Sequence, residues 1–361
     1  MDCLRVKTQY LQEGCILSQD VFSLTNRPIM TKKTVLKSDL LEVLRAFLIV
    51  EVSVEKTLID GRPFKPAEVI DEEAEAIAAE TAFSTQYLNS VQSFKKLFRS
   101  WQAGTPVDTT KLREIVLPLL NKALEKPSDI FLLHHYSTKA DYLFHHAVSV
   151  ALLSGFIAKK LNYEKGDILQ VAMGGCLCDC GMSKISPKIL EKKTSLTFSE
   201  FDEIKKHPIH GLKMLQNSSF LKEGVKFAVF QHHERLDGSG YPSGKNGKKP
   251  HPFANIVAIA DVYHAMTSER IYRKKHSPYK VLEMILHDDF GKFDLAALKA
   301  LISGIANFSI GSRVKLSNGY TAEILFIETN APTRPLVKII ETNEILHLEK
   351  NRELYIEEII A

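Results

Sequence analysis

The sequence lacks the features that mark several classes of protein. Only five cysteines and one tryptophan occur among its 361 residues, and no apolar run approaches the ~20 residues that span a bilayer. Residues 1–7 lack the basic and then apolar pattern of a signal peptide. The 47 basic and 43 acidic residues leave a net charge of +4, which by itself does not indicate nucleic-acid or membrane binding. We therefore expect a cytoplasmic protein that neither inserts into a membrane nor binds a DNA or RNA duplex.

The cysteines do not form a disulfide pattern. Their number is odd, and Cys176, Cys178 and Cys180 are crowded into one short segment. A zinc site made of paired cysteines usually needs two separated pairs. Cys176 and Cys180 are therefore expected to be small core residues, and Cys178 is considered with the metal ligands below.

The spacing of apolar residues divides the chain into four segments. Residues 1–60 predict a small α+β module, residues 61–125 a helical connector, residues 126–307 a bundle of five or more helices, and residues 308–361 a small β-rich module. The connector is interpreted as a spacer or a dimerising segment, with signal relay as an alternative. The fold class is thus mainly α, with a small module at each end.

Individual elements can also be assigned. In the first module we expect two short strands within 21–30, a helix over 38–48 and a strand over 49–54. In the connector the pattern predicts helices over 73–82, 87–101 and 111–125. In the last module, Asn318-Gly319 is typical of a β-hairpin turn, and strands are expected over 337–340 and 345–348.

One segment, residues 232–242, carries the strongest chemical signal and reads HHERLDGSGYP. Neutral imidazole is the commonest metal ligand in proteins, and here two adjacent imidazoles precede two carboxylates. Gly238 and Gly240 permit a tight turn, and Pro242 stiffens its exit. Glu234 and Asp237 are expected to order this loop rather than to bind metal. The segment indicates a metal-dependent site.

Other histidines and acidic residues lie in apolar or constrained surroundings. His146 continues an apolar helical stripe, where a single histidine is usually a core residue unless other ligands converge on it. Asp179 and Asp261 lie in apolar stretches, where an unpaired carboxylate is costly to bury. A metal ion would account for both charges. With His207, which precedes a proline, these residues form a mixed imidazole and carboxylate set that suits iron, manganese or zinc.

Taken together, these motifs resemble the HD-GYP family, a branch of the HD-domain phosphohydrolases that acts on the bacterial messenger cyclic di-GMP. The resemblance covers residues 135–285 in the expected order. Its most specific part is the signature His-His-Glu-x-x-Asp-Gly-x-Gly-Tyr-Pro, matched in full at 232–242. His146, His207 and the run 259–268 around Asp261 match the family's other positions, and residues 270–273 match its Arg-x-Tyr pattern.

The resemblance implies two metal positions. The first metal position would consist of His146, residue 178, Asp179 and Asp261. The second metal position would consist of Asp179, His207, His232 and His233, so that Asp179 bridges the two. Two divalent ions are implied, iron or manganese, with zinc as an alternative.

The chain departs from the family at its namesake motif. Where the family has His-Asp-x-Gly-Lys, this chain has Cys178-Asp179-Cys180-Gly181-Met182. Tyr142 stands where relatives often carry an extra acidic ligand, and Asp141 comes one residue earlier. Cys178 is either a thiolate ligand, which would make the metal a weaker Lewis acid, or an unligated thiol beside a weak or empty first position.

The substrate side of the predicted site has also changed. By resemblance, the lysine that Met182 replaces approaches a phosphate, and its loss would cost ~1.5–3 kcal/mol. Arg270 and Arg273 remain as candidate phosphate contacts, and Tyr241 as a base-stacking residue in the catalytic loop. Arg270 and Asp261 would lie on opposite faces of one unbroken helix, so the helix should end near Thr267-Ser268.

The function implied is therefore a metal-dependent phosphodiesterase that hydrolyses cyclic di-GMP by attack of a metal-bound hydroxide, with Asp179 and Tyr241 as catalytic residues and with reduced activity. The alternatives are an inactive module that binds cyclic di-GMP or a signalling partner protein, and a phosphohydrolase for another cyclic dinucleotide. A homodimer is expected.

Overall fold

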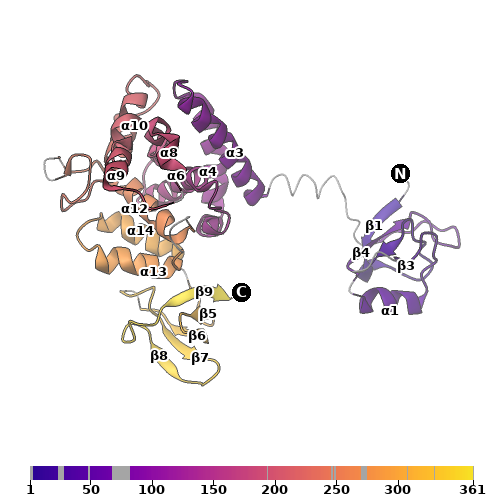
Figure 1. Cartoon of the computed structure of the whole chain (residues 1–361). Helices are drawn as coiled ribbons and strands as arrows, with labels where there is room; N and C mark the ends of the chain where they lie inside the picture. The colour runs from indigo at the N-terminus through magenta and orange to yellow at the C-terminus, as the bar shows by residue number, and fades with distance from the viewer. Residues whose placement is uncertain are drawn as a thin grey trace. The chain divides into compact units, whose positions relative to one another are not determined.

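The computed structural model describes residues 3–22, 28–47, 49–66, 82–192, 194–244, 247, 249–269, 275–306, 308–328 and 330–360. The chain divides into two compact units, Met1–Thr85 and Gln86–Ala361, and each is described by itself. Figure 1 traces the chain from the small first unit into the larger helical one. As predicted, the fold is mostly helical with a small sheet near each end.

The first unit is a small α+β module. Strand β1 (Cys3–Lys7) pairs antiparallel with β4 (Glu51–Glu55), and β2 (Val21–Phe22) pairs with β3 (Pro28–Met30). Helix α1 (Ser38–Ala46) buries Leu44 in a core with Leu17, Leu36 and Val54. The expected helix and strands are therefore confirmed. The turn expected between β2 and β3 lies at residues 23–27, outside the described residues.

Two long helices lead into the helical domain. They are α3 (Phe83–Gln102) and α4 (Thr109–Glu125), as predicted from the apolar spacing. The Asp108 side chain caps α4 by accepting hydrogen bonds from the backbone N–H groups of Thr110 and Lys111. Almost all of the helix expected over 73–82 lies outside the described residues. The contacts of α4 with α6 and α7 make this segment part of the second compact unit.

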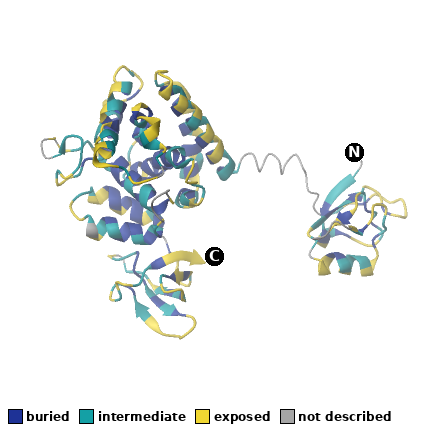
Figure 2. Cartoon of the chain, viewed as in Figure 1, coloured by how far each residue is buried: buried dark blue, intermediate teal, exposed yellow. Residues whose placement is uncertain are grey.

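The helical domain is assembled around one buried helix. Its helical segments are α5 (Ser128–Phe131), η2 (Leu133–His135), α6 (Tyr142–Lys160), α7 (Lys165–Leu177), η3 (Cys180–Lys184), α8 (Pro187–Leu190), α9 (Phe198–Ile204), α10 (His207–Leu215), α11 (Glu223–Gln231), α12 (Pro252–Thr267), α13 (Pro278–Glu283), η5 (Met284–Asp288) and α14 (Leu295–Ile305). Every residue of α6 from His145 to Ala158 is buried, and Figure 2 shows this dark core. By length and composition alone α6 could cross a membrane, but most of it is buried inside the domain, as in the core helix of a folded domain.

Close backbone approach fixes the packing of α6 against α7. A Cβ on Gly175 would lie 2.7 Å from the Val150 carbonyl oxygen, so only glycine fits at this contact. Cys176 and Cys180 are fully buried nearby, as expected for core residues. Helix α12 ends at Thr267, which confirms the break predicted near Thr267-Ser268. Helix α7, which precedes Asp179, packs closely on the core helix, and η3, which follows it, packs on α10.

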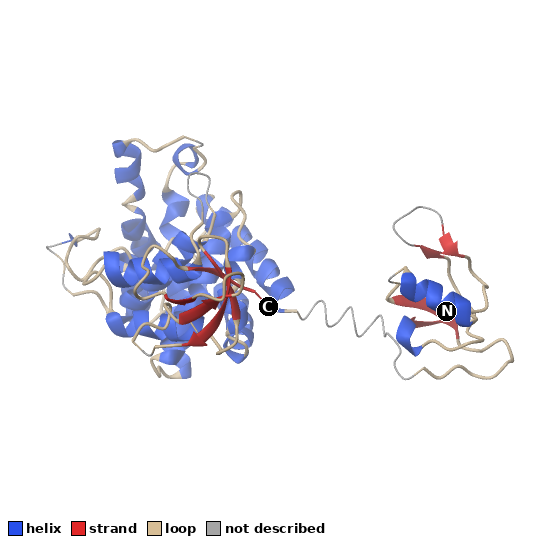
Figure 3. Ribbon diagram, turned by 90° about the horizontal axis from the view of Figure 1, so that it is seen from below, coloured by secondary structure: helices blue, strands red, loops and turns tan. Residues whose placement is uncertain are grey.

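The C-terminal module is a five-stranded antiparallel sheet with strand order β8-β7-β6-β5-β9. Its strands are β5 (Arg313–Leu316), β6 (Thr321–Phe326), β7 (Leu336–Ile339), β8 (Ile345–His347) and β9 (Ile356–Ile360). The hairpin predicted at Asn318-Gly319 joins β5 to β6, and Gly319 has a φ of 90°. Strand β9 was not expected. It pairs with β5 and completes the sheet drawn in red in Figure 3.

Candidate metal centre

Four side chains from three segments converge on one point of the helical domain. Single donor atoms of Asp179, His207, His232 and His233 all lie within 4.8 Å of one another. His207 Nε2 lies 3.2 Å from Asp179 Oδ1 and 3.2 Å from His232 Nε2. His207 and His232 are completely buried. This cluster is the set that the resemblance assigned to the second metal position, and three imidazoles with one carboxylate suit a transition-metal ion.

Backbone carbonyl groups orient two of these imidazoles. His207 Nδ1–H donates to the Ile204 carbonyl at 2.8 Å, and His232 Nδ1–H donates to the Val229 carbonyl at 2.9 Å. A carbonyl oxygen can only accept, so each Nδ1 carries the hydrogen and each Nε2 keeps its lone pair. Metal-ligating histidines usually have such a partner on the second ring nitrogen. The geometry therefore fits a metal ion at the Nε2 atoms.

Helix ends and glycines bring these residues together. Asp179 lies in the turn between α7 and η3, His207 is the first residue of α10, and His232 directly follows α11. A Cβ on Gly181 would lie 2.0 Å from the His207 carbonyl oxygen, so this glycine permits the η3 turn to pack on the start of α10. The backbone thus sets the distance between Asp179 and His207.

The residues assigned to the first metal position make a different set of contacts. His146 Nε2 lies 2.9 Å from Asp261 Oδ1 and 3.6 Å from Asp179 Oδ2. Its Nδ1 lies 3.1 Å from Tyr142 Oη and 3.0 Å from His264 Nδ1. Asp179 therefore faces both positions through different oxygens, as a bridging residue would. In contrast to His207 and His232, the partners of His146 Nδ1 are side chains.

Cys178 is fully buried, and its thiol donates to the Gly175 carbonyl at 3.1 Å. Burial raises the pKa of this thiol well above its usual value, and the neighbouring Asp179 and Asp261 add to the effect. The protein alone therefore holds Cys178 as a neutral thiol, which is the inert form. Of the two alternatives for Cys178, this contact supports the unligated thiol.

Neighbouring imidazoles keep the buried carboxylates of the centre ionised. Burial by itself would raise the pKa of Asp179, but the neighbouring imidazoles of His207 and His232 outweigh burial and hold it well below its usual value. Asp261 behaves in the same way because of its contact with His146. Burial and the neighbouring His232 lower the pKa of His233. Ionised carboxylates and neutral imidazoles are the forms that bind metal ions.

The loop over the centre is ordered by its own carboxylates. Glu234 accepts hydrogen bonds from the backbone N–H groups of Ser243 and Gly244, at 2.6 and 3.1 Å. Asp237 accepts from the backbone and hydroxyl of Ser239, at 2.9 and 2.7 Å. Neither Glu234 nor Asp237 belongs to the metal-ligand cluster identified among the described residues. Their contacts match the ordering role expected for them.

Tyr241 is held against the centre by stacking. Its ring lies 4.6 Å from the ring of His233, with 28° between the planes. A Cβ on Gly240 would lie 2.3 Å from the His233 carbonyl, so the loop can fold back this closely only with glycine there. Tyr241 also lines a cavity of about 250 Å³ beside the centre, together with Arg235 and Lys292.

Arg235 and Lys292 were missed as candidate substrate contacts. The Arg235 guanidinium lies 4.5 Å from the Phe293 ring centroid and donates to the backbone carbonyl of Glu234 at 2.7 Å. Lys292 pairs with Asp289 at 2.7 Å. Arg235 lies within the signature, but Lys292, which lines the same cavity, is 57 positions further along the chain. The local sequence around each residue therefore does not indicate that they share a cavity.

The other predicted substrate residues fall into two groups. Met182 lies in η3, partly exposed, between the buried Gly181 and Ser183. Lys184 does not replace the missing lysine, because its Nζ donates to the Trp101 carbonyl at 2.6 Å. Arg270 and Arg273 lie outside the described residues.

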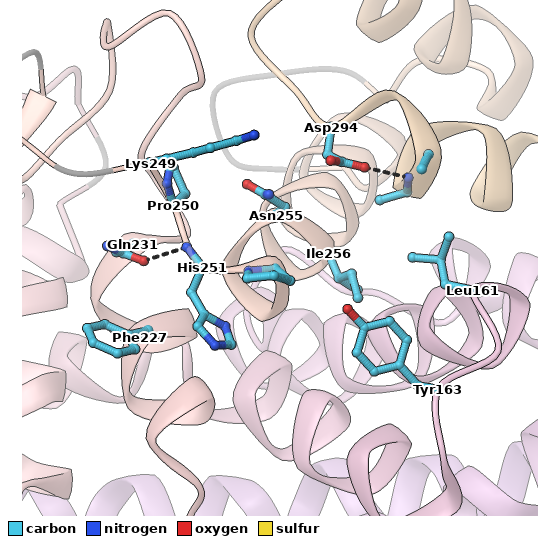
Figure 4. A pocket seen from close by; sticks show the side chains of 13 residues that line it. Leu161, Tyr163, Phe227, Gln231, Lys249, Pro250, His251, Asn255, Ile256 and Asp294 are labelled. Carbon is cyan, nitrogen blue, oxygen red and sulfur yellow. Dashed lines mark hydrogen bonds between the residues drawn. The ribbon is translucent and has the colours of Figure 1, made fainter.

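Two further contacts tie the centre to the rest of the domain. Tyr87 of α3 approaches His145 Nδ1 at 3.0 Å and Ser149 Oγ at 2.9 Å, directly beside His146. In addition, Gln231 Oε1 accepts from the His251 backbone N–H at 2.9 Å, which links the end of α11 to the start of α12. Figure 4 shows this bond at a separate cavity of about 680 Å³, which Gln231 and His251 help to line.

Comparison with known proteins agrees with this geometry. Residues 133–296 match the family model described as HD domain. A cyclic di-GMP phosphodiesterase from Pseudomonas aeruginosa is 28% identical over 243 residues, which cover 67% of this chain and 58% of that protein. The cyclic di-GMP phosphodiesterase PdeB from Borreliella burgdorferi is 30% identical, over 61% of this chain and 58% of that protein. The chain thus spans less than two thirds of these relatives.

Two more similarities are to another phosphodiesterase and to a solved structure. A 3'3'-cGAMP-specific phosphodiesterase from Vibrio cholerae is 30% identical over 46% of this chain and 36% of its own length. The fold is similar to the solved structure of a HDG"Y"P protein from Bdellovibrio bacteriovorus, with a TM-score of 0.50 and 16% identity. That similarity covers 83% of this chain and 98% of the other, and at this identity it shows the fold alone.

Proposed function

We propose that this chain, whose residues 133–296 form an HD domain related to the HD-GYP cyclic di-GMP phosphodiesterases, hydrolyses cyclic di-GMP in a metal-dependent reaction. The observation that carries the proposal is the convergence of Asp179, His207, His232 and His233 within 4.8 Å. Relatives whose names state this activity are 28% and 30% identical to this chain, over 67% and 61% of its length.

The residues of the centre have different proposed roles in metal binding. His207 and His232 present Nε2 lone pairs because backbone carbonyls hold their Nδ1–H groups. Asp179 would contact both metal positions. When bound, divalent ions supply Lewis acidity that activates water and the phosphodiester. We propose two divalent ions, iron or manganese, with zinc as an alternative.

Substrate contacts are proposed on the exposed side of the centre. The phosphates of cyclic di-GMP need positive charge, which Arg235 and Lys292 offer in the cavity beside His233. Arg270 and Arg273 are further candidates from the sequence. Tyr241, already stacked on His233, offers an aromatic surface for a guanine base. Met182 would fill space near a phosphate without supplying charge.

A second candidate function is a module that binds cyclic di-GMP without cutting it. The neutral, buried Cys178 thiol and the uncharged Met182 favour this reading, because both weaken the first metal position and its substrate contacts. Such a module would report to a partner protein. Homodimer formation and a partner protein remain proposals for either function.

The decisive experiment measures metal content and turnover on the same sample. The purified chain is loaded with Mn²⁺, Fe²⁺ or Zn²⁺, bound metal per chain is measured by mass spectrometry, and cyclic di-GMP cleavage is followed by chromatography. We expect bound metal and slow cleavage, both lost in Asp179→Asn. Nucleotide binding without cleavage in a metal-loaded protein would instead support the binding module. Faster cleavage of 3'3'-cGAMP would reassign the substrate.

A further inference from the structure

The cavity drawn in Figure 4 is not used by the proposed function. Its volume of about 680 Å³ lies within the range of small-molecule sites in proteins. We call it the α11–α12 cavity, because Phe227 and Gln231 of α11 and Asn255 of α12 line it. Among the described residues, none of the four residues of the metal-ligand cluster lines it. It is therefore separate from the metal centre, although Gln231 directly precedes His232 in the chain.

One side of the α11–α12 cavity offers an aromatic surface. The Phe227 ring is 38% exposed, and its centroid lies 5.6 Å from that of the His251 ring, with 18° between the planes. His251 is held in place because its Nδ1 accepts a hydrogen bond from the Phe253 backbone N–H at 3.1 Å. Figure 4 shows both rings in the lower part of the view. Exposed aromatic rings of this kind bind nucleobases by stacking.

Polar side chains of the cavity keep hydrogen-bonding capacity that the protein does not use. Within the described part of the chain, the side chains of Asn255 and Tyr163 make no hydrogen bond. Gln231 uses its Oε1 for the His251 backbone N–H, and its amide nitrogen makes no hydrogen bond with these residues. An amide both donates and accepts. It can therefore pair with the edge of a nucleobase, where donors and acceptors lie next to one another.

Two charged side chains border the cavity on the other side. Figure 4 shows Lys249 and Asp294 in the upper part of the view. Lys249 makes no ion pair with any residue that the structure describes, and a lysine ammonium group is a common partner of phosphate. Asp294 accepts from the Ala297 backbone N–H at 2.9 Å through Oδ1, and its Oδ2 can accept from the N–H groups of a base. The lining thus combines a cation, an acceptor and an aromatic surface.

We infer that the α11–α12 cavity binds a nucleoside monophosphate, with the base on Phe227, the edge of the base at Asn255 and the phosphate at Lys249. This class of ligand has a flat ring, an edge of donors and acceptors, and one anionic group, and the lining offers a partner for each. A plain phosphate would leave the ring surface and the amides without partners. An uncharged aromatic molecule would leave Lys249 without one. The inference does not rest on the proposed hydrolysis, because no metal ligand takes part.

Isothermal titration calorimetry of the full chain tests this binding, with GMP, AMP and UMP as probes. A chelator in the buffer removes metal ions, so that the result does not depend on the metal centre. We expect at least one nucleotide to bind, and the preferred base identifies the edge that Asn255 and Asp294 recognise. Ribose 5-phosphate and the matching nucleoside each lack one half of the ligand. Both should bind roughly tenfold or more weakly than the nucleotide.

Matched substitutions locate the site. Lys249→Gln removes the positive charge from this cavity, and nucleotide affinity should fall by roughly ten- to a hundredfold. Lys292→Gln is the control, because it makes the same change in the cavity beside the metal centre and should leave this affinity unchanged. Phe227→Ala removes the stacking surface and provides a second variant. In the unaltered chain, the side-chain amide NMR signals of Asn255 and Gln231 should shift when the nucleotide binds.

Three results would overturn the inference. The first is no binding of any of the three nucleotides up to about 1 mM. The second is equal binding of ribose 5-phosphate, which would show a phosphate site without recognition of a base. The third is an affinity that falls in Lys292→Gln and not in Lys249→Gln, which would place the nucleotide beside the metal centre. Each of these results leaves the proposed cleavage of cyclic di-GMP standing, and loss of cleavage would leave nucleotide binding at this cavity standing.

Discussion

The two metal positions use similar side chains in different surroundings. In the second, His207 and His232 are oriented by the carbonyls of Ile204 and Val229, which belong to the helical backbone. In the first, His146 is oriented by Tyr142 and His264. The second position is therefore built by the fold, whereas the first depends on side chains that one substitution can change.

Loss of a donor from the second position is the largest effect we expect. His207→Ala removes a completely buried imidazole that contacts both Asp179 and His232. Metal affinity and turnover should fall by more than the roughly 100-fold that marks the loss of an outer partner. His146→Ala should lower metal affinity and turnover by a smaller factor. Equal losses in the two variants, measured by metal analysis and nucleotide cleavage, would contradict the distinction between the positions.

A change at Gly181 should disturb the second position through the backbone. In Gly181→Ala the new Cβ would lie 2.0 Å from the His207 carbonyl and 2.5 Å from the Gly211 nitrogen. We expect a loss of about 3 kcal/mol in unfolding free energy, at the upper end for overpacking, measured by urea denaturation. Gly166→Ala is the control, because its Cβ meets nothing within 4 Å. Equal unfolding free energies of the two variants would contradict this expectation, because they would show that the η3 backbone can shift away from α10 at little cost.

Restoring the family residues should strengthen the first position. Cys178→His with Met182→Lys adds an imidazole donor and a positive charge, and turnover should rise roughly ten- to a hundredfold, as for a regained bond worth ~1.5–3 kcal/mol. Each single variant separates metal binding from phosphate binding. A folded double variant that binds metal without any gain in turnover would place the defect elsewhere.

The smallest effect concerns the reactivity of Cys178. Burial raises the pKa of its thiol, so little thiolate forms at neutral pH, and each unit of increase lowers that fraction about tenfold. In timed alkylation read by mass spectrometry, the partly exposed Cys3 should react first and Cys178 at least roughly tenfold more slowly. Rapid labelling of Cys178 in the metal-free protein would show that it is a thiolate after all.

Local sequence patterns predicted the elements and part of the centre. Apolar spacing located α3, α4 and α1, and the Asn318-Gly319 turn located a hairpin. His264 was missed although it lies one turn after Asp261, because its partner His146 is on another helix, and the approach of α6 to α12 has no signature in either segment. For the same reason the sequence did not reveal the cavity shared by Arg235 and Lys292.

Helix α3 contacts both segments in which this chain departs from the family pattern, the one that follows Tyr142 and the one that contains Cys178 and Met182. Near its start, Tyr87 of α3 holds His145, the neighbour of His146, and about four turns later the Trp101 carbonyl holds Lys184, two residues beyond Met182. Two hydrogen bonds, one near each end, therefore anchor α3 to the helical domain. A change in the position of α3 within the domain would therefore act on the segment before His146 and on the segment after Met182 together.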